Sequence, residues 1–569
     1  EFFGRRLGVK VRKLAFALGQ NIPRGVVFGL HPDSVGTFSG PARSLAHRSI
    51  CVPSAWRAGH LGVNSLKSGF YRLFTIPRTM TQVTNTVRFV LDGQIVEAQG
   101  KRRTTTVLDY LREQLHRTGT KEGCAEGDCG ACVVMVGELN AAGTGVDYVA
   151  TNACIQLLPS LDGKSVKTVE SLKKADGSMH PVQEEMVKCH GSQCGFCTPG
   201  IVMSLVNLVQ VLPTPNRQQI TDSLSGNLCR CTGYKPIIES AAKACAKPAA
   251  LKLDDSADVH LLKEIQRSKV PTLSLDGDII VQPVVRTKKG NEFVSPATLA
   301  EVADYLVKNP TTTLLAGSTE IGLQVNKQFS RPDHIMYLGN VAELRQVTET
   351  ASAWRIGAAV SLTQVEALVA QAYPDFTEVL RRFGSPPIRS TATLAGNIAN
   401  GSPIGDTMPC LMALGASLVL RCGDKTRKVL LDNFYTGMKK NVMELGEFIE
   451  AVELPKPVAG QVFRAHKVSK RFEQDISATC AAISYTLKDG KLSGVKLAYN
   501  GLAPSPCRAP KLEAVLEGQL PADVKAADLD AAIAASFTAR DGLRATWAYR
   551  ALVARNLALE FIEEQKEVA

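Results

Sequence analysis

Cysteine clustering is the feature that most restricts how this chain can fold. Eight of its fifteen cysteines lie in two short stretches, between Cys124 and Cys154 and between Cys194 and Cys231. Fifteen cysteines are too few for a disulfide-stapled scaffold in a chain of 569 residues. Clustered thiols without a secretion signal indicate metal or redox chemistry in a reducing compartment, and we expect a cytoplasmic protein.

The first cysteine set has the spacing Cys124-x4-Cys129-x2-Cys132, followed by Cys154. This spacing is typical of plant-type [2Fe-2S] ferredoxins. Three thiolates from one loop must converge on a small cluster, and small residues between them permit that approach: Gly123, Ala125, Gly127, Gly130 and Ala131. A zinc site and a redox disulfide between Cys129 and Cys132 remain as alternative interpretations.

The second set pairs Cys194-x2-Cys197 with Cys229-x-Cys231. The Cys-Gly-Phe-Cys run alone resembles a thioredoxin-type motif, but no βαβ pattern surrounds it. The C-x-C half is unusual for structural zinc. Taken alone, the spacing leaves both an iron–sulfur cluster and a zinc ion open.

Two stretches rich in small residues are candidate ligand loops. Residues 314–322 (LLAGSTEIG) pass from an apolar strand into small polar residues and then a helix, a shape that suits a pyrophosphate. Residues 395–406 (AGNIANGSPIGD) have no helical or strand period, as expected of a ligand loop. The chain contains no G-x-G-x-x-G fingerprint, so a dinucleotide-binding Rossmann unit is not indicated.

The runs GSQCGFCTPG (191–200) and GNLCRCTGY (226–234), preceded by the first cysteine set and followed by both loops, resemble the molybdenum hydroxylase family. The resemblance implies a [2Fe-2S] cluster on each set of four cysteines. It places Gln193 and Cys231 near a molybdopterin. It also implies an FAD site: residues 314–321 and Asn397 at the pyrophosphate, Phe383 by the flavin ring, and further contacts from Thr393, Asp406 and Lys467. Residues 314–321 are Leu314, Leu315, Ala316, Gly317, Ser318, Thr319, Glu320 and Ile321.

The resemblance further implies an activity and its partners. The chain would be the electron-transfer half of an enzyme that hydroxylates a purine such as hypoxanthine or xanthine at a molybdenum cofactor on a large partner subunit. Two small and two large chains would form a heterotetramer, and FAD would pass electrons to NAD⁺. The stretch 467–476 would lie on the nicotinamide side, although Gln474 replaces an Asp of some members. Alternatives are a relative acting on aldehydes or other N-heterocycles, and a stand-alone flavin and iron–sulfur reductase.

The predicted fold is multidomain α+β. A hairpin around Asp92-Gly93 and a helix over 105–116 belong to a β-grasp, ferredoxin-like [2Fe-2S] domain (83–168). Four short helices predict a [2Fe-2S] bundle (169–250). Residues 251–285 carry mixed charge with little periodicity and are expected to be a linker. A two-part α+β FAD-binding domain of the molybdenum hydroxylase flavoprotein type follows (286–459 and 460–569).

Charge is distributed unevenly along the chain. Residues 1–79 contain twelve Lys and Arg against Glu1 and Asp33, which supplies +10 of the formal net charge of +12. The nearly neutral remainder argues against nucleic-acid binding, and no apolar run is long enough to cross a membrane. We expect residues 1–79 to lie outside the fold, either as an organelle transit peptide or as sequence upstream of a natural start at Met80.

Overall fold

The computed structural model describes residues 83–84, 86–99, 101–174, 176–246, 251–266, 272–273 and 292–563. The predicted extension, 1–79, lies outside the described residues. Within the described part of the chain, no helix is both long and apolar enough to cross a bilayer.

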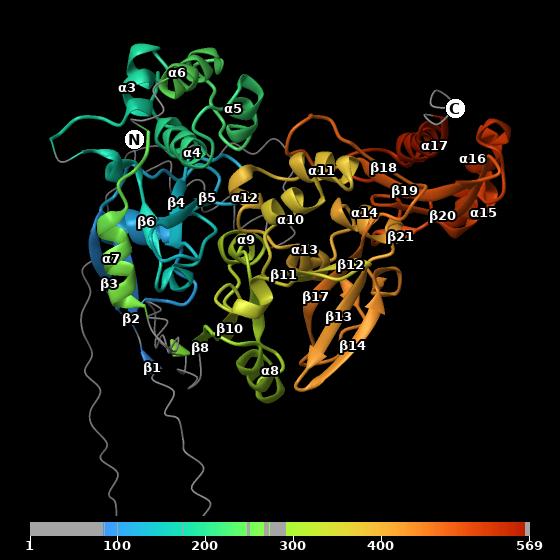
Figure 1. Ribbon diagram of the computed structural model, residues 1–569, viewed down its shortest axis with the longest axis horizontal. Helices are drawn as coiled ribbons and strands as arrows, with labels where there is room; N and C mark the ends of the chain where they lie inside the picture. Colours follow the sequence, from blue (N-terminus) through green and yellow to red (C-terminus); the bar gives the residue numbers. More distant parts are fainter. Residues whose placement is uncertain are drawn as a thin grey trace, which may run out of the picture. The chain divides into compact units, whose positions relative to one another are not determined.

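The first domain is a five-stranded mixed sheet in the order β3-β2-β6-β4-β5 (Figure 1). Its strands are β2 (Thr86–Leu91), β3 (Gln94–Gln99), β4 (Val133–Leu139), β5 (Val146–Asn152) and β6 (Ser165–Lys167). The predicted hairpin is confirmed: Asp92 and Gly93 take positive φ values of 53° and 70° between β2 and β3. β6 pairs parallel with β2 and antiparallel with β4, which is the β-grasp arrangement.

The helix predicted over 105–116 is shorter than expected. It consists of α2 (Val107–Asp109) and a π-helical turn (Tyr110–Gln114). His116 then adopts a positive φ of 55°, so the helix ends before Gly119, which the sequence suggested as its end.

Four helices form the second domain, as predicted, and Figure 1 shows them gathered together. They are α3 (Pro181–Lys188), α4 (Thr198–Val211), α5 (Arg217–Ser223) and α6 (Lys235–Cys245). The central helix α4 is buried along most of its length and packs against β4, so that Ile201 and Leu205 share a core with Val133 and Met135. This packing joins the two cysteine-bearing domains.

The segment expected to be a linker contains a well-packed helix, α7 (Ser256–Ile265). Its Asp258 is 1% exposed. That carboxylate accepts a hydrogen bond from Tyr148 at 2.7 Å and pairs with Lys167 at 3.0 Å. The helix is therefore anchored to the ferredoxin-like sheet by a buried charge, a contact that periodicity along the sequence does not reveal.

Among the described residues, the flavoprotein region contains four further sheets, one of them a two-stranded sheet of β15 (Tyr435–Gly437) and β16 (Lys440–Asn441). Strands β8 (Glu292–Val294), β9 (Thr313–Leu315) and β10 (His334–Tyr337) pair in parallel, with β10 in the middle. An antiparallel sheet has the order β11-β12-β17-β13-β14. Its strands are β11 (Val347–Glu349), β12 (Ala353–Gly357), β13 (Ser417–Cys422), β14 (Lys425–Leu430) and β17 (Phe448–Pro455). The helices of this part are α8 (Leu299–Lys308), α9 (Ile321–Lys327), α10 (Leu362–Val369), α11 (Pro374–Arg381), α12 (Pro386–Arg389), α13 (Leu394–Asn400) and α14 (Thr407–Ala413).

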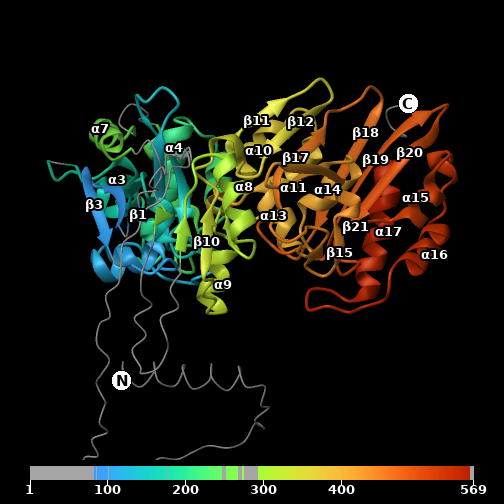
Figure 2. The same cartoon turned by 90° about the horizontal axis from the view of Figure 1, so that it is seen from below.

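The last part is an antiparallel sheet with helices beside it (Figure 2). The strands are β18 (Gln461–Val468), β19 (Thr479–Lys488), β20 (Lys491–Tyr499) and β21 (Cys507–Arg508), and the helices are α15 (Pro510–Leu516), α16 (Ala526–Ser536) and α17 (Trp547–Glu563). Phe463, Ala482 and Ala498 of this sheet pack into the core of the preceding part. The two parts of the flavoprotein region therefore share one hydrophobic core.

Candidate functional site

The loop that carries the first three cysteines wraps around the Cys124 sulfur. Three backbone N–H groups approach Cys124 Sγ at 3.3–3.4 Å, those of Glu126, Asp128 and Cys129. The loop turns through three residues with positive φ, namely Ala125, Gly127 and Gly130. Because N–H donors stabilise negative charge on sulfur, this loop is suited to hold a thiolate at Cys124.

The four thiols of the first set lie next to one another. Hydrogen bonds from the Cys129 and Cys154 thiols hold the pKa of Cys124 well below its usual range. Contacts with Cys124 and Cys132, together with burial, raise the pKa of Cys154. In the described residues no three metal-binding side chains close on the position of a single ion. Four adjacent sulfurs with backbone donors fit a [2Fe-2S] cluster, in which each iron takes two thiolates.

The second set lies nearer the surface. Cys194 and Cys231 are both exposed. The pKa of Cys194 is lowered, mainly by a hydrogen bond from the Phe196 N–H and also by one from the Cys231 thiol. Burial and the neighbouring Cys229 raise the pKa of Cys197 to about 12. Gln193 is exposed beside Cys194. The four thiols are thus brought together, with two of them on an open face of the bundle.

The two cysteine loops touch each other. The Leu228 N–H donates to the Cys129 carbonyl at 3.0 Å, and the Asn227 amide donates to the Gly130 carbonyl at 3.2 Å. A Cβ on Gly200, in α4, would lie 2.0 Å from that same Gly130 carbonyl, so only glycine fits there. Close backbone packing therefore links the two predicted cluster sites.

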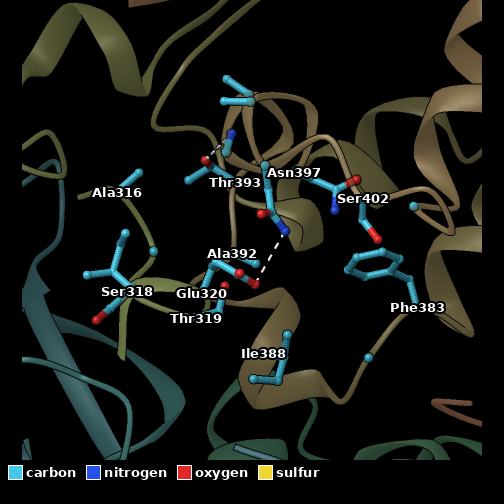
Figure 3. A pocket seen from close by; sticks show the side chains of 18 of the residues that line it. Ala316, Ser318, Thr319, Glu320, Phe383, Ile388, Ala392, Thr393, Asn397 and Ser402 are labelled. Carbon is cyan, nitrogen blue, oxygen red and sulfur yellow. Dashed lines mark hydrogen bonds between the residues drawn. The ribbon is translucent and has the colours of Figure 1, made fainter. Parts of the chain in front are cut away.

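A cavity of about 640 Å³ lies between the predicted FAD loops (Figure 3). Every predicted FAD residue lines it except Leu315, which is fully buried in the hydrophobic core. Successive side chains of a strand point to opposite faces, so Leu314 of β9 faces the cavity while Leu315 faces the core. Of the stretch 314–321, Leu315 alone does not place its side chain in the cavity wall. The Phe383 ring lies across the cavity from Ala316 and Ser318 in this view.

The polar loops of the cavity are held by local contacts. A Cβ on Gly317 would fall 2.0 Å from the Thr391 carbonyl, so glycine is required where the two loops meet. Thr393 caps α13 by accepting the Gly396 N–H at 3.0 Å. The Asn397 side-chain oxygen accepts a hydrogen bond from Thr407 at 2.6 Å, which orients its amide. These contacts give the cavity a preformed polar wall that fits a pyrophosphate.

Asp406 and Lys467 form a buried ion pair at the edge of the cavity. The Lys467 ammonium and the Asp406 carboxylate are 2.8 Å apart. The Lys467 side chain is 2% exposed and the Asp406 side chain 5%. Asp406 also accepts from Ser477 at 2.6 Å and Asn500 at 2.8 Å, and Lys467 donates to the Arg382 carbonyl at 3.1 Å. The pair therefore joins both parts of the flavoprotein region as well as bordering the cavity.

Besides Lys467, the predicted nicotinamide-side stretch (467–476) reaches the cavity through residues 474–476. Gln474 takes a positive φ of 55° there. The Arg382 guanidinium lies over the Phe472 ring at 4.4 Å and donates to the Phe472 and Lys467 carbonyls at 3.0 and 2.9 Å. Arg382 thus holds this stretch against the end of α11.

Sequence reasoning missed the apolar part of the cavity wall. Ile388 of α12, Met443, and Phe448 and Ile449 of β17 also line it. Their sequence pattern is that of ordinary core residues, so only the arrangement of the strands and helices identifies them.

Family models match four consecutive segments of the chain. Residues 89–155 match a 2Fe-2S iron-sulfur cluster binding domain, and residues 168–242 match a [2Fe-2S] binding domain. Residues 288–457 match the FAD binding domain in molybdopterin dehydrogenase, and residues 464–565 match the CO dehydrogenase flavoprotein C-terminal domain. The matches cover both cysteine sets and the cavity.

Curated relatives match about three quarters of this chain. The xanthine dehydrogenase of Drosophila subobscura is 32% identical over 483 residues, covering 77% of this chain and 36% of that protein. Aldehyde oxidase 4 of Cavia porcellus is 31% identical over 463 residues, covering 73% and 34%. This chain therefore spans about a third of the length of these curated relatives. A CO dehydrogenase structure from Oligotropha carboxidovorans has a TM-score of 0.45 and 24% identity over 49% of this chain and 98% of its own.

Proposed function

The chain belongs to the molybdenum hydroxylase family as its iron–sulfur and FAD part, and from this premise we propose that it serves a xanthine dehydrogenase. In this proposal hypoxanthine or xanthine is hydroxylated at a molybdenum cofactor held by a molybdopterin-binding partner. The electrons then pass through two [2Fe-2S] clusters to FAD and on to NAD⁺. The proposed assembly contains two copies each of this chain and its partner.

The observation that carries the substrate assignment is the similarity to xanthine dehydrogenases over about three quarters of this chain, at 32% identity. Two four-thiol sets and a lined cavity support the cofactors. When bound, the clusters would supply one-electron transfer and the flavin would supply hydride chemistry.

The residues of this chain would bind and orient those groups. Each set of four cysteines would hold its cluster, and the loop from Ala316 to Thr319 together with Asn397 would hold the FAD pyrophosphate. Phe383 would lie beside the flavin ring. The exposed positions of Gln193 and Cys231 support a role in facing the molybdopterin partner.

A second substrate class has its own support. Aldehyde oxidase 4 of Cavia porcellus matches nearly as well as the xanthine dehydrogenases, at 31% identity. The substrate would bind to the molybdenum partner, so the residues of this chain do not choose between a purine and an aldehyde.

The test is to purify this chain with the molybdopterin-binding partner and compare turnover of xanthine and of an aldehyde, with NAD⁺ as acceptor. We expect xanthine to give the larger kcat/KM. The chain by itself should oxidise NADH with an artificial acceptor but should not hydroxylate xanthine. A preference for the aldehyde would replace the xanthine assignment, and xanthine hydroxylation without any partner would overturn the proposed division of labour.

A further inference from the structure

Three residues spaced four apart, Ser318, Gly322 and Asn326, lie along one face of α9 and the turn before it. The Ser318 hydroxyl donates to the Ile155 carbonyl at 2.6 Å. A Cβ on Gly322 would lie 2.1 Å from that same carbonyl, so the helix backbone packs directly on Ile155. Residues at i and i+4 share a helix face, and this face contacts the segment that contains Cys154.

Asn326 is the point where two cysteine segments of the first set are tied together. Its side-chain nitrogen donates to the Cys154 carbonyl at 2.7 Å and to the Ala125 carbonyl, next to Cys124, at 3.0 Å. A primary amide carries two N–H hydrogens, so these two bonds use both of them. One side chain thereby holds Cys154 against the loop that carries Cys124.

The neighbouring Lys327 reinforces this contact from the surface. Its ammonium donates to the Cys124 carbonyl at 2.6 Å and pairs with Glu126 at 3.4 Å. The Lys327 side chain is 44% exposed, so solvent screens this contribution. The Asn326 amide is half-buried, so its hydrogen bonds are held more firmly than those of Lys327.

The same short helix borders the FAD cavity. Ser318 in the preceding turn and Ile321 and Gln324 of the helix line the cavity, while Asn326, two residues after Gln324, reaches the cysteine loop. In Figure 3 the Ser318 hydroxyl points away from the cavity, towards the ferredoxin-like domain. α9 therefore contacts both predicted redox sites within two helical turns.

We propose that Asn326 is a positioning residue for the first iron–sulfur cluster. It fixes the Cys124 and Cys154 segments relative to each other and to the flavin cavity. Asn326 thereby sets the electronic environment of the first cluster and the rate at which that cluster exchanges electrons with FAD. Of these two effects, only the electron exchange rests on the proposed function. Groups that orient metal ligands from outside the ligand set commonly change metal affinity or activity by about 10- to 100-fold when removed.

The test compares Asn326→Ala with Asn309→Ala in the full chain loaded with iron and FAD. Asn309 is the control because its side-chain amide, at the end of α8, donates only to a local carbonyl, that of Tyr305 at 3.2 Å. Iron and FAD content, the electron paramagnetic resonance spectrum of the dithionite-reduced protein and the midpoint potential of each cluster are measured. The rate of flavin-to-cluster electron transfer is followed after photoreduction. Cys197→Ser, which removes a ligand of the second set, assigns the two cluster signals.

We expect Asn326→Ala to retain FAD and an unaltered second-cluster signal. Its first-cluster signal and midpoint potential should shift, and transfer between flavin and cluster should slow by about 10-fold. Asn309→Ala should match the parent protein. If both variants give the parent's signals and rates, the proposal is overturned.

Asn326→Ser, which keeps a single short donor, decides the matter if the alanine variant does not fold. An altered first-cluster signal in that variant supports the proposal, and an unaltered one overturns it. None of these measurements uses a purine or NAD⁺, so failure of the xanthine assignment would leave their outcome unchanged.

Discussion

At the scale of single residues, the Asp406–Lys467 pair makes the sharpest energetic prediction. Asp406→Asn leaves the buried Lys467 ammonium without its counter-charge. Removing one partner of a buried ion pair costs about 3–5 kcal/mol, because the other charge stays buried and unpaired. We expect the free energy of unfolding to fall by about that amount, measured by denaturant titration, with loss of FAD. Asp489→Asn, at an exposed turn with positive φ, is the control and should leave stability unchanged. Equal stability of the two variants would contradict the prediction.

At the scale of elements, Glu138 of β4 ties the ferredoxin-like sheet to the flavoprotein region. It pairs with Lys164 at 2.7 Å and with Arg345 at 2.6 Å. Burial alone raises the pKa of Glu138, but these two cations outweigh it and bring the pKa to about 2. A Glu in the unfolded chain titrates near pH 4.3. The contribution of the ionised Glu138 to the free energy of unfolding is therefore complete above about pH 4.3 and disappears as the pH falls towards 2.

We therefore expect Glu138→Gln to lower the free energy of unfolding at pH 7 by about 1–2 kcal/mol, a value reduced because the side chain is 31% exposed. The difference from the parent protein should shrink below about pH 4.3, as followed by denaturant titration at several pH values. Glu113→Gln, on the exposed side of the π-helical turn, is the matched control. A difference that stays constant down to pH 2 would rule out the ion pairs as its cause.

At the scale of the whole molecule, the second cysteine set and the flavin cavity lie in different hydrophobic cores. Cys197→Ser should therefore remove one cluster, or two iron atoms per chain, while FAD and the first cluster remain. Iron analysis measures the clusters that remain, and flavin absorbance measures the bound FAD. Cys189→Ser, at the end of α3 and outside both sets, should retain all the iron. Loss of FAD together with the iron in Cys197→Ser would show that the two sites do not assemble independently.

Much of the site was predictable because its ligands are close together in sequence. Three of the four first-set cysteines share one loop, and both ligand loops are continuous stretches, so spacing and small residues marked them as candidate sites, while the resemblance assigned their cofactors. The hairpin and the four helices were predictable for the same reason, since turn dipeptides and periodicity are local signals. Strand alternation is a further local rule, and it turns the Leu315 side chain away from the cavity wall and into the core.

The order of domains, the two sets of thiols and the polar loops of the cavity are all local patterns, so they can be found along the chain. Which distant residues meet depends on how the sheets and helices pack. That packing placed Asp258 of the presumed linker beneath the ferredoxin-like sheet, joined Asp406 to Lys467, and brought Asn326 onto the carbonyls of Ala125 and Cys154. An Asp, a Lys or an Asn has the same local preference whether it is solvated or buried. Its partner is chosen by how sheets and helices pack, because only a buried charge or amide must find one.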